Sequence, residues 1–168
     1  MDTQRTVYCM NLKDNRDPSN KSIELKFKLC FEKSMIAIGW SVPETVNTWE
    51  EYKEIANQKW LGAKNYSSAR NNLERLKKED LVWVKNPLTN ERYLVEITDE
   101  YPGIYSSLKE FDTCAYRKGD FHLINETLLT DALSANKLRA RATLEQKHRE
   151  DTCTATIKLF ENLKVKSK

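Results

Sequence analysis

Ser34-Met35-Ile36-Ala37-Ile38-Gly39-Trp40-Ser41 is a short apolar run that ends in a glycine, a tryptophan and a hydroxyl residue. A continuous apolar run of this length predicts a buried strand, and the glycine marks the point where the chain leaves the core. A tryptophan at the end of such a strand packs in the core more often than it binds a ligand. The exit from this strand is still the first place in the chain to look for a binding site.

Length and composition point to one globular domain. The chain has 168 residues, close to the average of about 150 residues per domain. Its hydrophobic fraction of 39% and charged fraction of 32% are typical of a real core under a well solvated surface. No apolar run approaches the ~20 residues of a membrane span, and the N-terminus lacks the pattern of a signal peptide. We therefore expect a single domain over residues 1–168, in the cytoplasm and without contact to a membrane.

The four cysteines, Cys9, Cys30, Cys114 and Cys153, are scattered along the chain without a close pair or a neighbouring histidine. Disulfide frameworks and zinc sites need ligands that converge, and closely spaced cysteines are their usual sign. The spacing therefore predicts free thiols in a reducing compartment. Only two histidines are present, so we expect neither a metal site nor a cofactor.

Positive charge is concentrated at the C-terminal end. The net charge of the whole chain is only +3, but residues 137–168 hold nine Lys and Arg against four Asp and Glu. A basic helical segment of this kind can hold phosphate groups. A run of charges is equally often a solvated face, and both interpretations stay open.

The first half of the chain reads as strands and helices around the apolar run. Residues 6–10 have the β-branched and aromatic content of a strand, and the polar, proline-containing residues 14–20 predict a loop. Residues 23–31 alternate like a strand but also share one side of a helix, so their structure stays open. Thr48 and Glu51 form a capping box that starts a helix, which Gly62 ends. A second helix begins near Ser67 or Ser68.

The second half begins with a predicted hairpin. The strands Leu81–Val84 and Arg92–Thr98 flank a turn at residues 86–90, and their alternation predicts that one face of the hairpin meets water or a polar cavity. A tyrosine-rich loop over residues 100–107 follows, and tyrosines on such loops often recognise ligands. We expect a further strand from Tyr116 to Ile124 and helices at 126–138 and about 152–163.

Several of these segments, taken in order, resemble one family. They are Ile36-Ala37-Ile38-Gly39-Trp40, Asp80-Leu81-Val82-Trp83, the strand 93–98 with its tyrosine loop, and the strand carrying Arg117. The family comprises the PUA-like, EVE-type domains found beside nuclease modules in modification-dependent restriction enzymes, with an "IGW" strand followed by a "GDLV" strand. Residues 139–144, Arg-Ala-Arg-Ala-Thr-Leu, also look like the closing "GRTLQ" segment. The resemblance covers about Val7 to Leu163, with Glu79 where the "GDLV" strand usually opens with glycine.

The resemblance implies an α+β fold, a PUA-like (EVE-type) small curved β-barrel flanked by helices. Its aromatic pocket accepts a flipped, often methylated, nucleobase of DNA or RNA. A base that leaves its stack loses roughly a few kcal/mol of stacking and pairing, which aromatic walls and hydrogen bonds must replace. Trp40 and Ser41 stand where the hallmark motif ends, so they are the first candidates for wall and hydrogen-bonding group. Trp83, Tyr101 and Tyr105 are further candidate walls.

Cationic residues near such a pocket would contact phosphates, and five are candidates: Arg70, Arg117, Lys118, Arg139 and Arg141. We therefore predict a nucleic-acid-binding module that recognises a modified base and has no catalytic activity of its own. A protein partner would then supply nuclease activity.

Two alternatives remain. On the same fold the chain can act as a protein-interaction adaptor or inhibitor in a defence or anti-defence system. Less favoured is a metal-dependent nuclease, since Glu24-Leu25-Lys26 matches the end of the PD-(D/E)xK pattern with Asp14 or Asp17 upstream. Such an ExK match is common by chance in a highly charged chain. The sequence holds no glycine-rich phosphate loop or nucleophile elbow, which favours binding over turnover.

Overall fold

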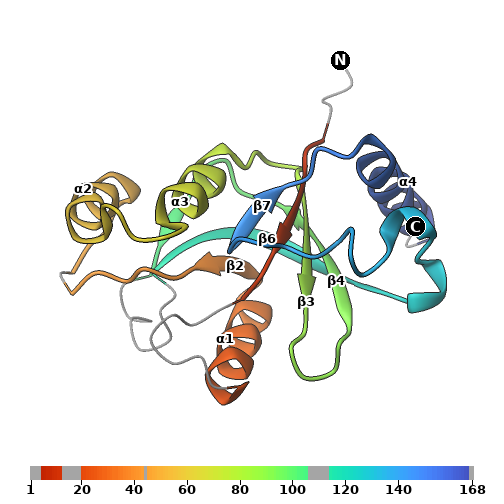
Figure 1. Cartoon of the computed structure of the whole chain (residues 1–168), viewed down its shortest axis with the longest axis horizontal. Helices are drawn as coiled ribbons and strands as arrows, with labels where there is room; N and C mark the ends of the chain where they lie inside the picture. The colour runs from red at the N-terminus through yellow and green to blue at the C-terminus, as the bar shows by residue number, and fades with distance from the viewer. Residues whose placement is uncertain (1–4, 13–19, 44, 106–113, 167–168) are drawn as a thin grey trace.

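The strands form one curled sheet. The computed structural model describes residues 5–12, 20–43, 45–105 and 114–166 (Figure 1). Seven strands lie within these ranges, in the order β2-β6-β4-β3-β1-β7, with β5 paired to β6 beside this path. Only β1 and β3 pair in parallel. The strands are β1 (Val7–Met10), β2 (Met35–Ile38), β3 (Leu81–Lys85), β4 (Arg92–Ile97), β5 (Gly103–Ile104), β6 (Ala115–Ile124) and β7 (Leu144–Gln146).

Helices cover both faces of the sheet. Side chains of α1 (Asn20–Glu32), α2 (Trp49–Trp60) and α3 (Tyr66–Arg75) join one core layer, while α4 (Glu150–Lys166) packs in the other. Figure 1 shows α4 on the side of the sheet away from α2 and α3. No helix of the described ranges combines the length and the apolar character needed to cross a bilayer. The α+β class and the curled sheet agree with the expected small curved barrel.

The two core layers arise from strict alternation along the central strands. Tyr8, Val82 and Val95 point into the layer with α1, α2 and α3, which we call the inner layer. Their neighbours Val7, Leu81 and Leu94 point into the layer with α4, the outer layer. The prediction of one wet face on the hairpin is therefore wrong, because α4 covers that face and Leu94 is fully buried.

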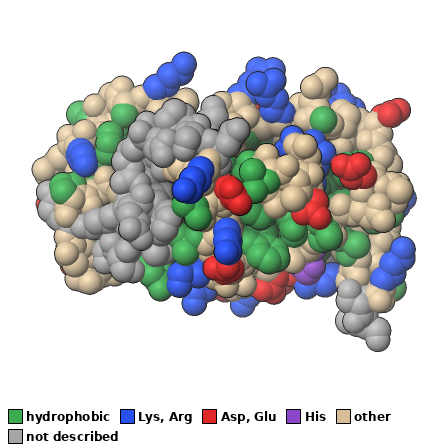
Figure 2. Space-filling view, turned by 90° about the horizontal axis from the view of Figure 1, so that it is seen from below, with side chains coloured by type: hydrophobic (Ala, Val, Ile, Leu, Met, Phe, Trp, Pro, Cys, Tyr) green, Lys and Arg blue, Asp and Glu red, His purple; other side chains and the backbone are tan. Residues whose placement is uncertain are grey.

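The segment that the sequence left open is a helix, α1. Its inner side carries the buried residues Lys26, Phe27 and Cys30. The strand-like alternation is a coincidence of composition, since Leu25 and Phe31 are 42% and 44% exposed. Figure 2 views the molecule from below, and hydrophobic side chains gather on this lower face, with charged side chains of both signs around them.

The predicted helix at residues 126–138 is wrong. Two single turns of 3-10 helix, η2 (Glu126–Leu128) and η3 (Asp131–Leu133), stand in its place. Leu129, Thr130 and Ser134 have extended backbone angles that interrupt a continuous helix. Only Leu133 of these turns is buried, so the segment lacks the apolar stripe that stabilises a helix on a core.

The other predicted helices and strands are confirmed, with small shifts at their ends, whereas the predicted loop at 14–20 lies almost wholly outside the described residues, as does the end of the loop at 100–107. Thr48 Oγ1 accepts a hydrogen bond from the Glu51 amide at 3.2 Å, and the Glu51 carboxylate accepts one from the Asn47 amide at 2.8 Å. This is the capping box, with Asn47 in place of Thr48 as the second donor. Gly62 follows the helix with a φ of 84°, a left-handed conformation that favours glycine.

Candidate functional site

A small pocket lies where β2 meets β6. Lys33, Met35, Tyr105, Tyr116 and Lys118 line it, and its volume is about 220 Å³. The antiparallel pairing of β2 with β6 places Met35 opposite Lys118. The pairing of β5 with β6 places Gly103 opposite Tyr116, and Tyr105 directly follows the end of β5. We call it the tyrosine pocket. It brings together residues more than seventy positions apart, two of which, Tyr105 and Lys118, the sequence had singled out.

Two aromatic rings and an ammonium group form its walls. The rings of Tyr105 and Tyr116 meet edge to face, with centroids 6.1 Å apart and planes at 60°. Lys33 Nζ lies 4.8 Å from the centre of the Tyr105 ring and donates a hydrogen bond to its hydroxyl at 3.1 Å. Aromatic faces beside a cation can hold a flat ring and a negative charge together.

The backbone holds both tyrosines in place. The Tyr105 amide donates to the Cys114 carbonyl at 2.8 Å. Gly103 lies against the Tyr116 ring, where an added Cβ would come within 2.4 Å of the ring carbon Cζ. The absence of a side chain at residue 103 therefore lets the Tyr116 ring lie over β5.

Both charged side chains among the described residues that line the pocket are lysines, Lys33 and Lys118. The Lys118 side chain is exposed, and no described residue pairs with its ammonium group. Its backbone amide donates to Asp99 Oδ2 at 2.8 Å. The other oxygen of Asp99 accepts from Arg117 Nε at 2.7 Å. Asp99 thus fixes the strand on which Lys118 stands while leaving the lysine head free to meet an anion.

Tyr116 can donate a hydrogen bond to a ligand. Partial burial, with smaller contributions from Asp99 and Tyr105, raises the pKa of its hydroxyl above the usual 10.0. The group therefore keeps its proton at neutral pH. Tyr116 is a wall that also carries a donor at its tip.

Comparison with known proteins identifies no relative. No protein-family model, curated protein or solved structure matches this chain. The resemblance to PUA-like, EVE-type domains rests on the short motifs quoted above. Function must therefore be argued from the geometry of the chain itself.

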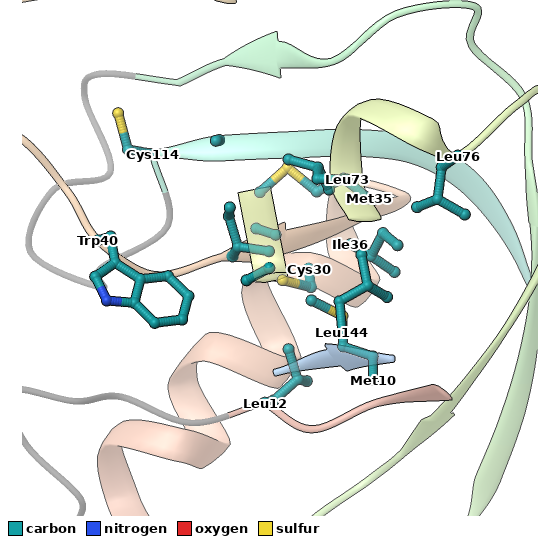
Figure 3. Close-up of a cluster of buried hydrophobic side chains, with 14 of the residues drawn as sticks. Met10, Leu12, Cys30, Met35, Ile36, Trp40, Leu73, Leu76, Cys114 and Leu144 are labelled. Carbon is teal, nitrogen blue, oxygen red and sulfur yellow. The ribbon is translucent and has the colours of Figure 1, made fainter. Parts of the chain in front are cut away.

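Trp40, the first candidate wall, is a core residue. It is 5% exposed, and its ring meets that of Tyr66 edge to face at 5.8 Å. Figure 3 shows the indole at one end of the inner cluster, opposite Leu76, Met10 and Leu144. Tyr52 donates a hydrogen bond to its carbonyl at 3.1 Å. Ser41 is also buried, at 8% exposed, so neither residue offers a face to a ligand in this conformation.

Trp83 lies on the opposite face of the sheet from Trp40. It is 3% exposed in the outer layer, and its Nε1 donates to Thr156 of α4 at 3.0 Å. The prediction that Trp40 and Trp83 share one mouth is therefore wrong, because alternation along β3 turns Trp83 toward α4. Tyr101 is 81% exposed but does not line the tyrosine pocket.

The five candidate phosphate-binding residues lie in four different places. Arg117 is fully buried, pairs with Asp99 and donates to the Leu73 and Leu76 carbonyls at the end of α3, so its predicted phosphate role is wrong. Arg70 donates to Asn57 and Asn71 beside a groove that also holds Glu50, Glu51, Glu54 and Glu74, which would repel phosphate. Lys118 lines the tyrosine pocket, and Arg139 and Arg141 line another one together.

Two of the nuclease candidates, Glu24 and Lys26, lie on different sides of α1. Glu24 is exposed on α1, whereas Lys26 is fully buried, as expected for residues two apart on a helix. Asp14 and Asp17 lie outside the described residues. Within the described ranges, no three His, Cys, Asp or Glu side chains gather as a metal site would require. The four cysteines are free thiols.

Sequence reasoning missed Lys33 and Tyr116 as site residues. Lys33 directly precedes the apolar run, and Tyr116 opens a predicted strand, so both were visible as positions. Their proximity depends on the pairing of β2 with β6, which joins residues some eighty positions apart. No local pattern in the sequence encodes that pairing.

Proposed function

We propose that the chain is a nucleic-acid-binding module that holds an unstacked base in the tyrosine pocket. The observation that carries this proposal is the convergence of two tyrosine rings and two lysines on one small opening. Its volume of about 220 Å³ lies below the roughly 300 Å³ at which pockets for drug-sized ligands begin. A single ring system such as a nucleobase suits that size.

Each wall has a role in this proposal. The base stacks on a tyrosine ring, and the Tyr116 hydroxyl donates to an acceptor on the base edge. Lys33 and Lys118 neutralise the adjoining phosphates. Stacking of one base on an aromatic side chain contributes about 1–3 kcal/mol, enough to offset much of the cost of unstacking.

Two backbone features support the resemblance to PUA-like, EVE-type domains. The segment before β2 is helical, as in many members of that family. Glu79 stands where the family has glycine, and its φ of 74° is the left-handed conformation that glycine adopts most readily. Both features favour the curved barrel of that family, whose members accept a flipped, often methylated, base.

Binding to labelled oligonucleotides at fixed salt tests the proposal. The panel holds single-stranded and duplex DNA and RNA, each with and without methylated bases. Tyr116→Ala should weaken binding by about 5- to 150-fold, the equivalent of one stacked base. Tyr101→Ala is the matched control, because Tyr101 is an exposed tyrosine outside the pocket.

Salt dependence gives a second readout. Lys118→Gln should weaken binding to all sequences alike and reduce the slope of log K against log salt by roughly 0.7–0.9. Binding that ignores Tyr116, or that loses as much affinity in Tyr101→Ala, would show that the tyrosine pocket holds no base.

Protein binding is the second candidate function, and one observation favours it. Leu25 and Phe31 of α1 are 42% and 44% exposed, and Phe31 packs on Tyr93, whose partner across the strands, Leu123, is 54% exposed. Figure 2 shows hydrophobic side chains gathered on the lower face of the molecule. Exposed apolar patches of this kind often mark protein contacts. An adaptor would lose its partner on Phe31→Ser and show no affinity for any oligonucleotide of the panel.

A further inference from the structure

The segment between η3 and β7 carries two arginines to one pocket. Asn136, Arg139 and Arg141 line this pocket, which has a volume of about 440 Å³ and is separate from the tyrosine pocket. Figure 1 shows the segment crossing the front of the molecule between η3 and β7. We call it the arginine pocket.

Buried neighbours and hydrogen bonds hold the backbone of this segment, which fixes the positions of the two arginines. Leu138 and Ala140 are buried, while Arg139 and Arg141 between and after them are exposed. Both arginines are therefore exposed, and both line the same pocket. Lys147 Nζ donates to the Arg139 carbonyl at 2.7 Å, and the Arg141 amide donates to Glu145 Oε2 at 2.7 Å.

The charges of the two arginines are not compensated within the described chain. Four other cations of the C-terminal region have partners: Lys137 and Arg149 pair with Asp151, Lys147 with Glu145, and Lys164 with Glu96. Among the described residues, no carboxylate lines the arginine pocket and none pairs with either guanidinium. Two like charges that share one opening repel each other, and a bound anion would remove that cost.

We infer that the arginine pocket binds a phosphoryl group. Guanidinium groups match phosphate oxygens in pairs, and two of them beside the Asn136 amide present only hydrogen-bond donors and one amide oxygen. The phosphate can come from a nucleic-acid backbone or from a free phosphate compound. The inference goes beyond the proposed function, since it does not require a base in the tyrosine pocket.

Two probes test it and separate the two sources. Pyrophosphate is titrated into the ¹⁵N-labelled protein while the amide and Nε signals of Arg139 and Arg141 are followed by NMR. A fluorescein-labelled abasic oligonucleotide, which has phosphates but no bases, is titrated by anisotropy. Saturable shifts with pyrophosphate alone would assign a free phosphate compound, and binding of both probes would assign a polymer backbone.

The variant Arg139→Gln/Arg141→Gln should bind whichever probe the wild type binds at least tenfold more weakly. Arg149→Gln/Lys158→Gln is the charge-matched control, because it also removes two positive charges and both residues lie outside the pocket. The inference is overturned if pyrophosphate leaves the arginine signals unchanged and the abasic oligonucleotide does not bind, or if Arg149→Gln/Lys158→Gln weakens binding equally. The abasic probe has no base to enter the tyrosine pocket, so failure of the tyrosine pocket and failure of the arginine pocket are told apart.

Discussion

Glu79 holds a left-handed backbone conformation that an ordinary side chain resists. Its φ is 74°, its amide donates to the Ile97 carbonyl, and its side chain is exposed. The conformation costs a non-glycine residue about 1–2 kcal/mol, while glycine adds about 0.4–1 kcal/mol of chain entropy to the unfolded state. Glu79→Gly should therefore stabilise the protein by about 0.5 kcal/mol in urea unfolding. Gly62→Ala, at another left-handed position, should destabilise it, and a loss of stability in Glu79→Gly would contradict this account.

Glu96 joins three distant parts of the chain through charge. It accepts from Arg5 at 3.1 Å and from Lys164 at 2.7 Å. Burial alone would raise its pKa, but the hydrogen bonds from Lys164 and Arg5 outweigh that effect and hold the pKa below its usual 4.5. A carboxylate with a lowered pKa contributes stability that is complete above its unfolded pKa and is lost as the pH falls through the folded one.

The stability difference between wild type and Glu96→Gln should therefore be constant near pH 7 and shrink as the pH falls below about 4.5, the usual glutamate pKa. Urea midpoints measured from pH 7 to pH 3 give this difference directly. Glu161→Gln, an exposed carboxylate on α4, serves as the control. A difference that stays unchanged down to pH 3 would show that Glu96 carries no linked proton.

Helix α4 is held on the sheet by one buried polar contact among apolar ones. Trp83 Nε1 donates to Thr156 Oγ1 at 3.0 Å, and both side chains are buried. Thr156→Val keeps the shape but leaves the indole N–H without a partner, which costs about 1–3 kcal/mol. Thr154→Val on the exposed side of the same helix should change stability by less than about 0.5 kcal/mol. Equal urea midpoints for the two variants would show that the contact does not hold α4.

Elements with strong local signals could be predicted from the sequence. The hairpin of β3 and β4, the strand β6 and the capped start of α2 are all confirmed. Local pattern failed where packing decides the outcome, as in residues 23–31 and 126–138. In the first case a helix packs its inner side on the sheet despite a strand-like sequence. In the second, a helix-like spacing lacks a surface to cover.

The two core layers share their strands, so the whole molecule should unfold in one step. Strands β1, β3 and β4 send alternate side chains into the inner and the outer layer. If one layer unfolds, these strands are disrupted, and the other layer loses the surface on which it packs. Two single-tryptophan variants test this, one keeping Trp40 in the inner layer and one keeping Trp83 in the outer layer. In each, the fluorescence transition in urea should coincide with the far-UV circular dichroism transition. An earlier fluorescence change in the Trp83 variant would mean that the outer layer, with α4, opens on its own.

At the scale of the molecule, the candidate site was the least predictable feature. The motif around Trp40 led to a real strand, β2, but this strand lies at one end of the strand order, and the tryptophan that follows it is enclosed by the core. The pocket instead forms at the opposite end of that strand, where β6 returns beside it and brings Tyr116 and Lys118 to Lys33. The sequence predicts the strands that line the tyrosine pocket. Which ends of these strands form the pocket depends on long-range pairing, which the sequence does not reveal.

Gly119 sits where β6 leaves its pairing with β2 and takes up its pairing with β4. A Cβ there would come within 2.5 Å of Val95 and 2.8 Å of the Glu96 carbonyl oxygen, which belongs to the backbone and cannot swing aside. In a saturation library scored for intracellular folding, codon 119 should therefore admit glycine alone. The flanking exposed positions, Lys118 and Asp120, should accept most replacements. Natural variants of this gene should therefore also keep glycine at position 119.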